Sequence, residues 1–172
     1  MDADYGHDMV REDAQLMKRV LLTGMSGTGK SSVIEELRKR GLKAIDMDEA
    51  GWSEHDDDGD QQWCESRVQE ALDSAGDDTL FISGCAENQV KFYPQLTDII
   101  LLSAPAEVLA ERLRTRTNNP YGKRPEELEE VLRNLETIEP LLRHGATYEI
   151  KTTIPLDQVV EEVLERVCLP SL

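Results

Sequence analysis

A glycine-rich segment at residues 24–31 has the residue types needed to hold a phosphate chain. It reads Gly-Met-Ser-Gly-Thr-Gly-Lys-Ser and fits the pattern G-x-x-x-x-G-K-S. In this pattern backbone N–H groups wrap the phosphates, the lysine reaches the β- and γ-phosphates, and the serine hydroxyl binds Mg²⁺. The segment therefore predicts nucleotide binding by Gly24, Met25, Ser26, Gly27, Thr28, Gly29, Lys30, Ser31 and Ser32.

Two acidic side chains, Asp46 and Asp48, are the next candidates for chemistry. They follow an expected strand at residues 43–45 and are two positions apart, so in extended chain they point the same way. We predict that Asp46 helps to hold Mg²⁺ and that Asp48 positions, and deprotonates, an attacking group. A solvated acidic loop is the alternative, because Glu49 and further acids follow. No Walker-B acid ends the apolar segment at residues 79–83, which leaves Asp46 as its best substitute.

Polar and basic residues at two further places complete the candidate site. Gly84, Glu87 and Asn88 follow the segment at residues 79–83 and are candidates for substrate contact. Turn-forming residues and cations share the segment 117–124, which we predict to be a mobile lid. Arg116 and Lys123 flank it and are the candidate catalytic cations, since phosphoryl transfer spreads negative charge over the phosphate oxygens. Ordinary surface cations paired with nearby glutamates are the alternative.

The elements that must position these residues alternate along the chain. Apolar segments predict strands near residues 19–22, 43–45, 79–83, 98–102 and 148–151. Helical periodicity predicts helices at residues 31–40, 61–75, 105–114, 125–138 and 156–167. This alternation is typical of an α/β fold with a parallel sheet covered on both faces. Ligands of such a sheet bind beyond the carboxyl ends of its strands, where all the candidate residues are expected.

The bulk properties limit the possible functions. With 172 residues, the chain is expected to form one domain at residues 18–172, after a flexible lead-in at residues 1–17. The formal charge of −16 argues against nucleic-acid partners. No segment is apolar for long enough to span a membrane, so we expect a cytoplasmic protein. The three cysteines are far apart, which argues against a disulfide framework or a zinc site.

These motifs resemble the small P-loop kinases of the nucleoside monophosphate, shikimate and gluconate kinase group. The resemblance covers residues 19–168 and rests on the loop at 24–31, on Asp46-Met-Asp48, and on the pair Arg112 and Arg116 before a short lid at 117–124. It implies a three-layer αβα fold with strand order 2-3-1-4-5. It also implies that ATP and Mg²⁺ are used to phosphorylate a hydroxyl or phosphate of a small metabolite. Arg112 would pack on the adenine, Asp48 would contact the acceptor, and Arg116 with Lys123 would grip the phosphates.

Two departures from the group concern the acceptor. The segment Ser83-Gly-Cys-Ala does not supply the glycine run that shikimate kinases have there. Arg67 is the only lysine or arginine between Lys43 and Lys91, whereas adenylate kinases carry more arginines and a longer lid. The sequence thus favours a hydroxylated, neutral or mildly charged acceptor. An ATPase or nucleotide-dependent switch that acts on a protein partner is the alternative function, and a polynucleotide kinase is opposed by the acidic charge. The oligomeric state is left open.

Overall fold

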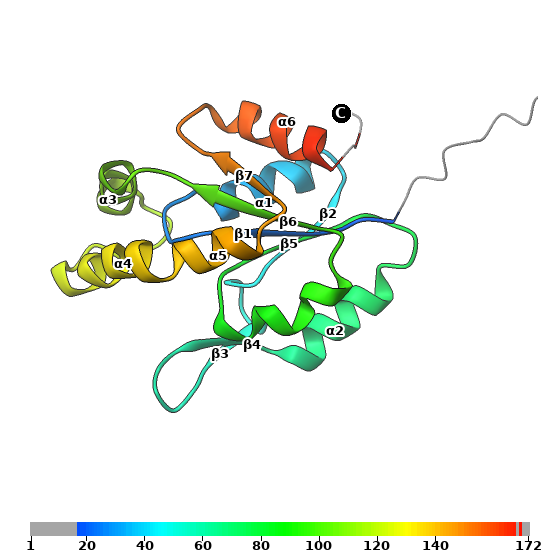
Figure 1. Cartoon of the computed structure of the whole chain (residues 1–172), viewed down its shortest axis with the longest axis horizontal. Helices are drawn as coiled ribbons and strands as arrows, with labels where there is room; N and C mark the ends of the chain where they lie inside the picture. The colour runs from blue at the N-terminus through cyan, green and yellow to red at the C-terminus, as the bar shows by residue number, and fades with distance from the viewer. Residues whose placement is uncertain (1–16, 168, 170–172) are drawn as a thin grey trace, which may run out of the picture.

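Five parallel strands form the central sheet of the molecule (Figure 1). The computed structural model describes residues 17–167 and 169, so the expected lead-in lies outside the described residues apart from Met17. The strands are β1 (Arg19–Thr23), β2 (Lys43–Asp46), β5 (Leu80–Ser83), β6 (Asp98–Ser103) and β7 (Tyr148–Lys151). Their order is β2-β5-β1-β6-β7, and every pair is parallel. Counted along the chain, this is the predicted order 2-3-1-4-5, which is confirmed.

Helices cover both faces of this sheet. On one face α1 (Lys30–Lys39) lies beside α6 (Leu156–Arg166), and on the other face lies α2 (Glu65–Ser74) (Figure 1). The apolar positions that predicted α1, namely Val33, Ile34 and Leu37, are fully buried against the sheet. Strand residues alternate between the two faces, with Leu22 in the α1 and α6 core and Leu21 in the α2 core. The three-layer α/β fold predicted from the alternating pattern is confirmed.

The segment at residues 53–63 was not predicted correctly. A helix was expected over residues 61–75, but β3 (Ser53–His55) and β4 (Gln61–Trp63) form an antiparallel hairpin and α2 begins only at Glu65. The Asp56 carboxylate accepts hydrogen bonds from the backbone N–H groups of Asp58 and Asp60, which closes the turn of the hairpin. Trp63 is buried against Phe92 in the core beneath α2. It lies in a strand, but its spacing from the apolar residues of α2 is also that of a helix, and this produced the wrong prediction.

The remaining helices lie between β5 and β7 in the chain. They are the 3-10 helix η1 (Glu87–Gln95), then α3 (Ala106–Thr115), α4 (Pro125–Thr137) and α5 (Glu139–Gly145). Neither η1 nor α5 was predicted, because η1 contains Pro94 and has weak periodicity, and α5 continues the apolar pattern of α4 after a bend at Ile138. Within residues 17–167 and 169, no helix has the length and apolar character needed to cross a lipid bilayer.

Candidate functional site

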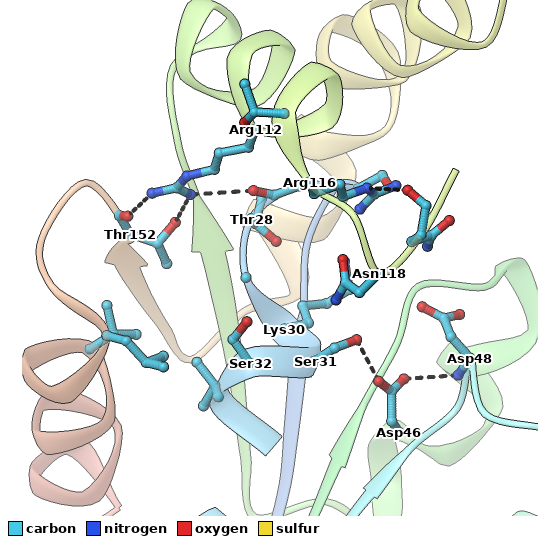
Figure 2. A pocket seen from close by; sticks show the side chains of 18 of the residues that line it. Thr28, Lys30, Ser31, Ser32, Asp46, Asp48, Arg112, Arg116, Asn118 and Thr152 are labelled. Carbon is cyan, nitrogen blue, oxygen red and sulfur yellow. Dashed lines mark hydrogen bonds between the residues drawn. The ribbon is translucent and has the colours of Figure 1, made fainter. Parts of the chain in front are cut away.

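One pocket, with a volume of about 540 Å³, lies where β1 and β2 end and α1 begins. It brings together the glycine-rich loop from Ser26 onward, the acidic pair and the two predicted arginines (Figure 2). Asp46 and Asp48 lie on one side of Lys30 and Ser31, while Arg112 and Thr152 lie on the other. The four residue groups expected at one crevice are therefore brought together in part: the loop, the acids and the lid line the pocket, and residues 84–88 do not.

The glycine-rich loop encloses the Lys30 ammonium group. Lys30 Nζ donates to the carbonyl oxygens of Gly24 at 2.7 Å and Met25 at 3.0 Å. Gly24 cannot be replaced without a clash, because a Cβ atom there would lie 2.3 Å from the backbone oxygen of Leu102. Burial lowers the pKa of Lys30, and the nearby thiol of Cys85 and carboxylates of Asp48 and Asp46 act in the opposite direction. A phosphate group would bring negative charge into direct contact with this ammonium group.

Ser31 and Asp46 form a direct contact beside the loop. Ser31 Oγ donates to Asp46 Oδ2 at 2.5 Å, and the backbone N–H of Asp48 donates to Asp46 Oδ1 at 2.9 Å. The Asp46 side chain is held from two sides and the residue is only 6% exposed. In the described part of the chain, no three His, Cys, Asp or Glu side chains gather to hold a metal by themselves. This oxygen-donor pair fits Mg²⁺, which takes few protein ligands and completes its shell with phosphates and water.

Asp48 lies at the mouth of the pocket, where the β3–β4 hairpin reaches it. Gln61 Nε2 donates to Asp48 Oδ1 at 2.9 Å. Sequence reasoning missed Gln61 because it was assigned to a helix. The signal that could have found it is the cluster of turn formers from Asp56 to Asp60, which is typical of a hairpin. The contact orients one carboxylate oxygen of Asp48 and leaves the other available to a ligand.

Arg112 forms one wall of the pocket with residues that the sequence did not reveal. Its Nη1 donates to Thr152 Oγ1 at 3.0 Å and to the Gly27 carbonyl at 3.3 Å, and its Nη2 donates to the Thr152 carbonyl. Ile154, Leu156 and Val159 line the same part of the pocket. Burial lowers the pKa of Arg112. A guanidinium plane beside aliphatic side chains is an arrangement that suits a flat aromatic ring.

Arg116 lines the pocket, but its side chain is bound to the lid. Nη2 donates to the Tyr121 carbonyl at 2.6 Å and Nε donates to the Asn119 carbonyl at 3.2 Å. Burial lowers the pKa of Arg116, and the Asp48 carboxylate opposes this shift. The lid is also tied to α4, since Tyr121 Oη donates to Glu130 Oε2 at 2.7 Å. These contacts join Arg116 to the lid and the lid to α4, while Arg116 still lines the pocket.

Lys123 lies outside the pocket, contrary to its expected place over the phosphates. Its Nζ donates to the Arg114 carbonyl at 2.9 Å, on the exposed side of the lid. The next cation, Arg124, forms an ion pair of 2.8 Å with Glu127. In this conformation Lys123 contacts the end of α3 and Arg124 contacts the start of α4, and neither side chain lines the pocket.

The three candidate substrate-binding residues after β5 lie outside the pocket, and two of them, Gly84 and Asn88, support the fold. Asn88 is 8% exposed, and its side chain binds the backbone N–H of Trp63 at 2.9 Å and the carbonyl of Trp63 at 3.0 Å. It anchors the hairpin to η1. Gly84 provides room for packing, since a Cβ there would lie 2.9 Å from Met47 Cβ. Glu87 is exposed and does not line the pocket. The turn into η1 directs these residues to the α2 side, which the sequence pattern could not show.

Cys85 behaves as a packed side chain. It packs against the core formed by Met25, Leu101, Ala104, Leu109 and Leu142. Burial raises the pKa of the Cys85 thiol, although the Lys30 ammonium acts in the opposite direction. A neutral thiol is a poor nucleophile.

Comparisons with known proteins find relatives in sequence and in fold. A family model described as "AAA domain" matches residues 20–134. An Archaeoglobus fulgidus protein named "Putative adenylate kinase" is 36% identical over 149 residues, which cover 84% of this chain and 79% of the relative. A shikimate kinase structure from Bacteroides thetaiotaomicron superposes with a TM-score of 0.63 at 22% identity, covering 89% of this chain and 99% of that one. A gluconokinase structure from Sinorhizobium meliloti gives 0.57 at 22% identity, covering 88% and 91%.

Proposed function

Because the chain belongs to the AAA-domain family of P-loop proteins and is a small-molecule kinase, we propose that it transfers the γ-phosphate of ATP, in the presence of Mg²⁺, to a small metabolite. The acceptor group is a hydroxyl or a phosphate. The observation that carries this proposal is the arrangement of Lys30, the Ser31–Asp46 pair and Asp48 along one wall of a single pocket. A switch module would need the nucleotide site but would have no use for Asp48 at the pocket mouth.

Each side chain in the pocket has a distinct task in this reaction. Lys30 would exchange its carbonyl partners for the β- and γ-phosphates, and Ser31 and Asp46 would hold the Mg²⁺ that accompanies the nucleotide. When bound, Mg²⁺ offsets the negative charge of the phosphate oxygens. Arg112 and the aliphatic residues beside it form the slot for the adenine ring. Gln61 holds Asp48 so that its free oxygen can accept a proton from the acceptor hydroxyl.

The acceptor oxygen attacks the γ-phosphorus while the bond from that phosphorus to the β–γ bridging oxygen breaks, and ADP leaves. Asp48 takes the proton that the acceptor hydroxyl loses, whereas a phosphate acceptor has no such proton to give. Arg116 lines the pocket, and after releasing its lid carbonyls it would stabilise the charge on the transferred group.

The partners of the cations in α2 and η1 support a hydroxylated acceptor over a phosphorylated one. Both of these cations already have a partner. Arg67 lies over the Trp52 ring at 4.1 Å from its centre, and Lys91 forms an ion pair of 2.7 Å with Glu65. The relative named as an adenylate kinase supports AMP as the competing choice.

A panel of acceptors tests the proposal directly. ATP-to-ADP turnover is measured with AMP, sugar acids, polyols and shikimate, each against a control without acceptor. We expect acceptor-dependent turnover well above the water background, and faster turnover with a hydroxylated compound than with AMP. Turnover that never exceeds the background, together with binding to a protein partner, would support the switch hypothesis instead.

The lid at residues 117–124 is expected to become ordered in a new position when nucleotide binds. Arg116 must give up the carbonyls of Asn119 and Tyr121 to reach a phosphate, which releases the lid from its present contacts. Hydrogen exchange across residues 117–124 should slow with a non-hydrolysable ATP analogue plus acceptor. Arg116→Ala should lower turnover by about 100-fold.

Two further variants sharpen the lid experiment. Lys123→Ala lowers turnover only if closure brings Lys123 from its present position into the site. Arg114→Ala is the matched control, because Arg114 is an exposed α3 cation whose ion pair with Glu111 lies outside the pocket. Equal hydrogen exchange in both states and wild-type turnover of Arg116→Ala would identify the segment as an ordinary surface loop.

A further inference from the structure

The Ser83 side chain is buried without a hydrogen-bond partner at the carboxyl end of β5. The residue is 1% exposed. In the part of the chain that the structure describes, its Oγ is one of three buried side-chain atoms that make no hydrogen bond. Buried hydroxyl groups are almost always hydrogen-bonded, so the position of this one calls for an explanation.

Strand register places this hydroxyl beside the proposed metal site. Ser83 is paired with Asp46 on β2 and with Leu22 on β1. Paired residues of parallel strands point to the same face of a sheet. The Asp46 carboxylate reaches Ser31 on α1, and Leu22 belongs to the core that includes Val33 and Ile34 of α1. Ser83 therefore points to the α1 face, next to Asp46.

Resting on the proposed function, we infer that Ser83 is a positioning residue for the metal: its hydroxyl binds a water molecule in the shell of Mg²⁺, beside Asp46. Mg²⁺ gives up its water reluctantly and keeps several molecules when it binds to protein and phosphate. Groups that orient such molecules govern affinity almost as strongly as direct ligands. A neutral hydroxyl does this without placing a second negative charge next to Asp46 in a buried site. Ser83 thus lies at the end of β5, the strand that has no Walker-B acid.

The test measures ADP binding by the Ser83→Ala variant. Binding is measured by calorimetry at a series of Mg²⁺ concentrations. We expect the Mg²⁺ concentration for half-maximal binding to rise about 10-fold. The affinity for ADP in EDTA should stay unchanged, because Ser83 does not touch the nucleotide in this assignment. Thermal unfolding of the ligand-free variant should be unchanged or shifted upward, since the substitution removes an unpartnered hydroxyl.

Two matched variants separate the inference from a structural effect. Ser83→Thr keeps the hydroxyl and should keep the Mg²⁺ requirement of the wild type. Ser103→Ala removes another buried serine hydroxyl at a strand end, but Ser103 Oγ donates to Glu149 at 2.8 Å on the opposite face of the sheet. It should not change the Mg²⁺ requirement.

The outcomes distinguish this inference from the proposed function. An unchanged Mg²⁺ requirement in Ser83→Ala, or equal losses of ADP affinity with Mg²⁺ and in EDTA, would overturn the role of Ser83 alone. Wild-type protein that binds ADP without any dependence on Mg²⁺ would overturn both. A lower unfolding temperature of ligand-free Ser83→Ala would also overturn the role of Ser83 in metal binding, because the hydroxyl would then stabilise the fold itself.

Discussion

Lys30→Ala is expected to lower phosphoryl transfer by about 100-fold or more while the protein remains folded. The Lys30 ammonium is enclosed by the glycine-rich loop, and among residues 17–167 and 169 it donates to the carbonyl oxygens of Gly24 and Met25. Alanine also suits the first position of α1, so the helix should persist. Steady-state turnover and circular dichroism of the purified variant measure the two expectations separately.

The matched control for this variant is Lys39→Ala on the same helix. The Lys39 side chain is 72% exposed and its nearest ion pair, with Glu36, is 3.8 Å long. Its removal should leave turnover unchanged. Near-normal turnover of a folded Lys30→Ala protein would show that the loop at residues 24–31 is not part of the catalytic site. The proposed kinase mechanism would then be wrong.

Asp48→Asn is expected to lower turnover by about 100-fold while ATP affinity changes little. The asparagine still fits at the pocket mouth beside Gln61, but it cannot take a proton from the acceptor. Asp46→Asn should behave differently, because Asp46 contacts Ser31 and faces the metal. Its main effect should be a higher Mg²⁺ requirement. Titrations of ATP and of Mg²⁺, at a saturating concentration of the acceptor found in the panel, separate the two roles.

The exposed residue Asp57 in the turn of the β3–β4 hairpin provides the control for the acidic pair. Asp57→Asn changes the net charge by the same amount away from the pocket and should leave both titrations as in the wild type. If Asp46→Asn and Asp48→Asn also retain the wild-type rate and Mg²⁺ requirement, the pair is a solvated acidic loop.

Features that depend on neighbouring residues could be predicted from the sequence. The loop at residues 24–31, the strand before it and the helix after it form one continuous segment, and their pattern required no partner to be known. Apolar runs such as residues 98–102 likewise marked the buried strands. The resemblance to P-loop kinases then supplied the strand order, which the structure confirms.

Features that depend on distant partners were decided by the tertiary structure. The hairpin exists because Trp63 packs on Phe92 and its backbone binds Asn88, contacts that no local spacing reveals. Arg112 is fixed by Thr152, which lies 40 residues further along the chain.

Packing also decided where side chains with similar positions in the sequence point. Arg116 and Lys123 flank the same loop, yet only Arg116 lines the pocket, because the lid turns and Lys123 meets the Arg114 carbonyl. The register of β2 and β5 places Ser83 beside Asp46, across 37 positions of sequence. Sequence alone thus determined which chemical groups this protein carries and where the five strands of the central sheet lie along the chain. The tertiary structure decided which groups meet, because side-chain direction depends on strand register, turns and long-range packing.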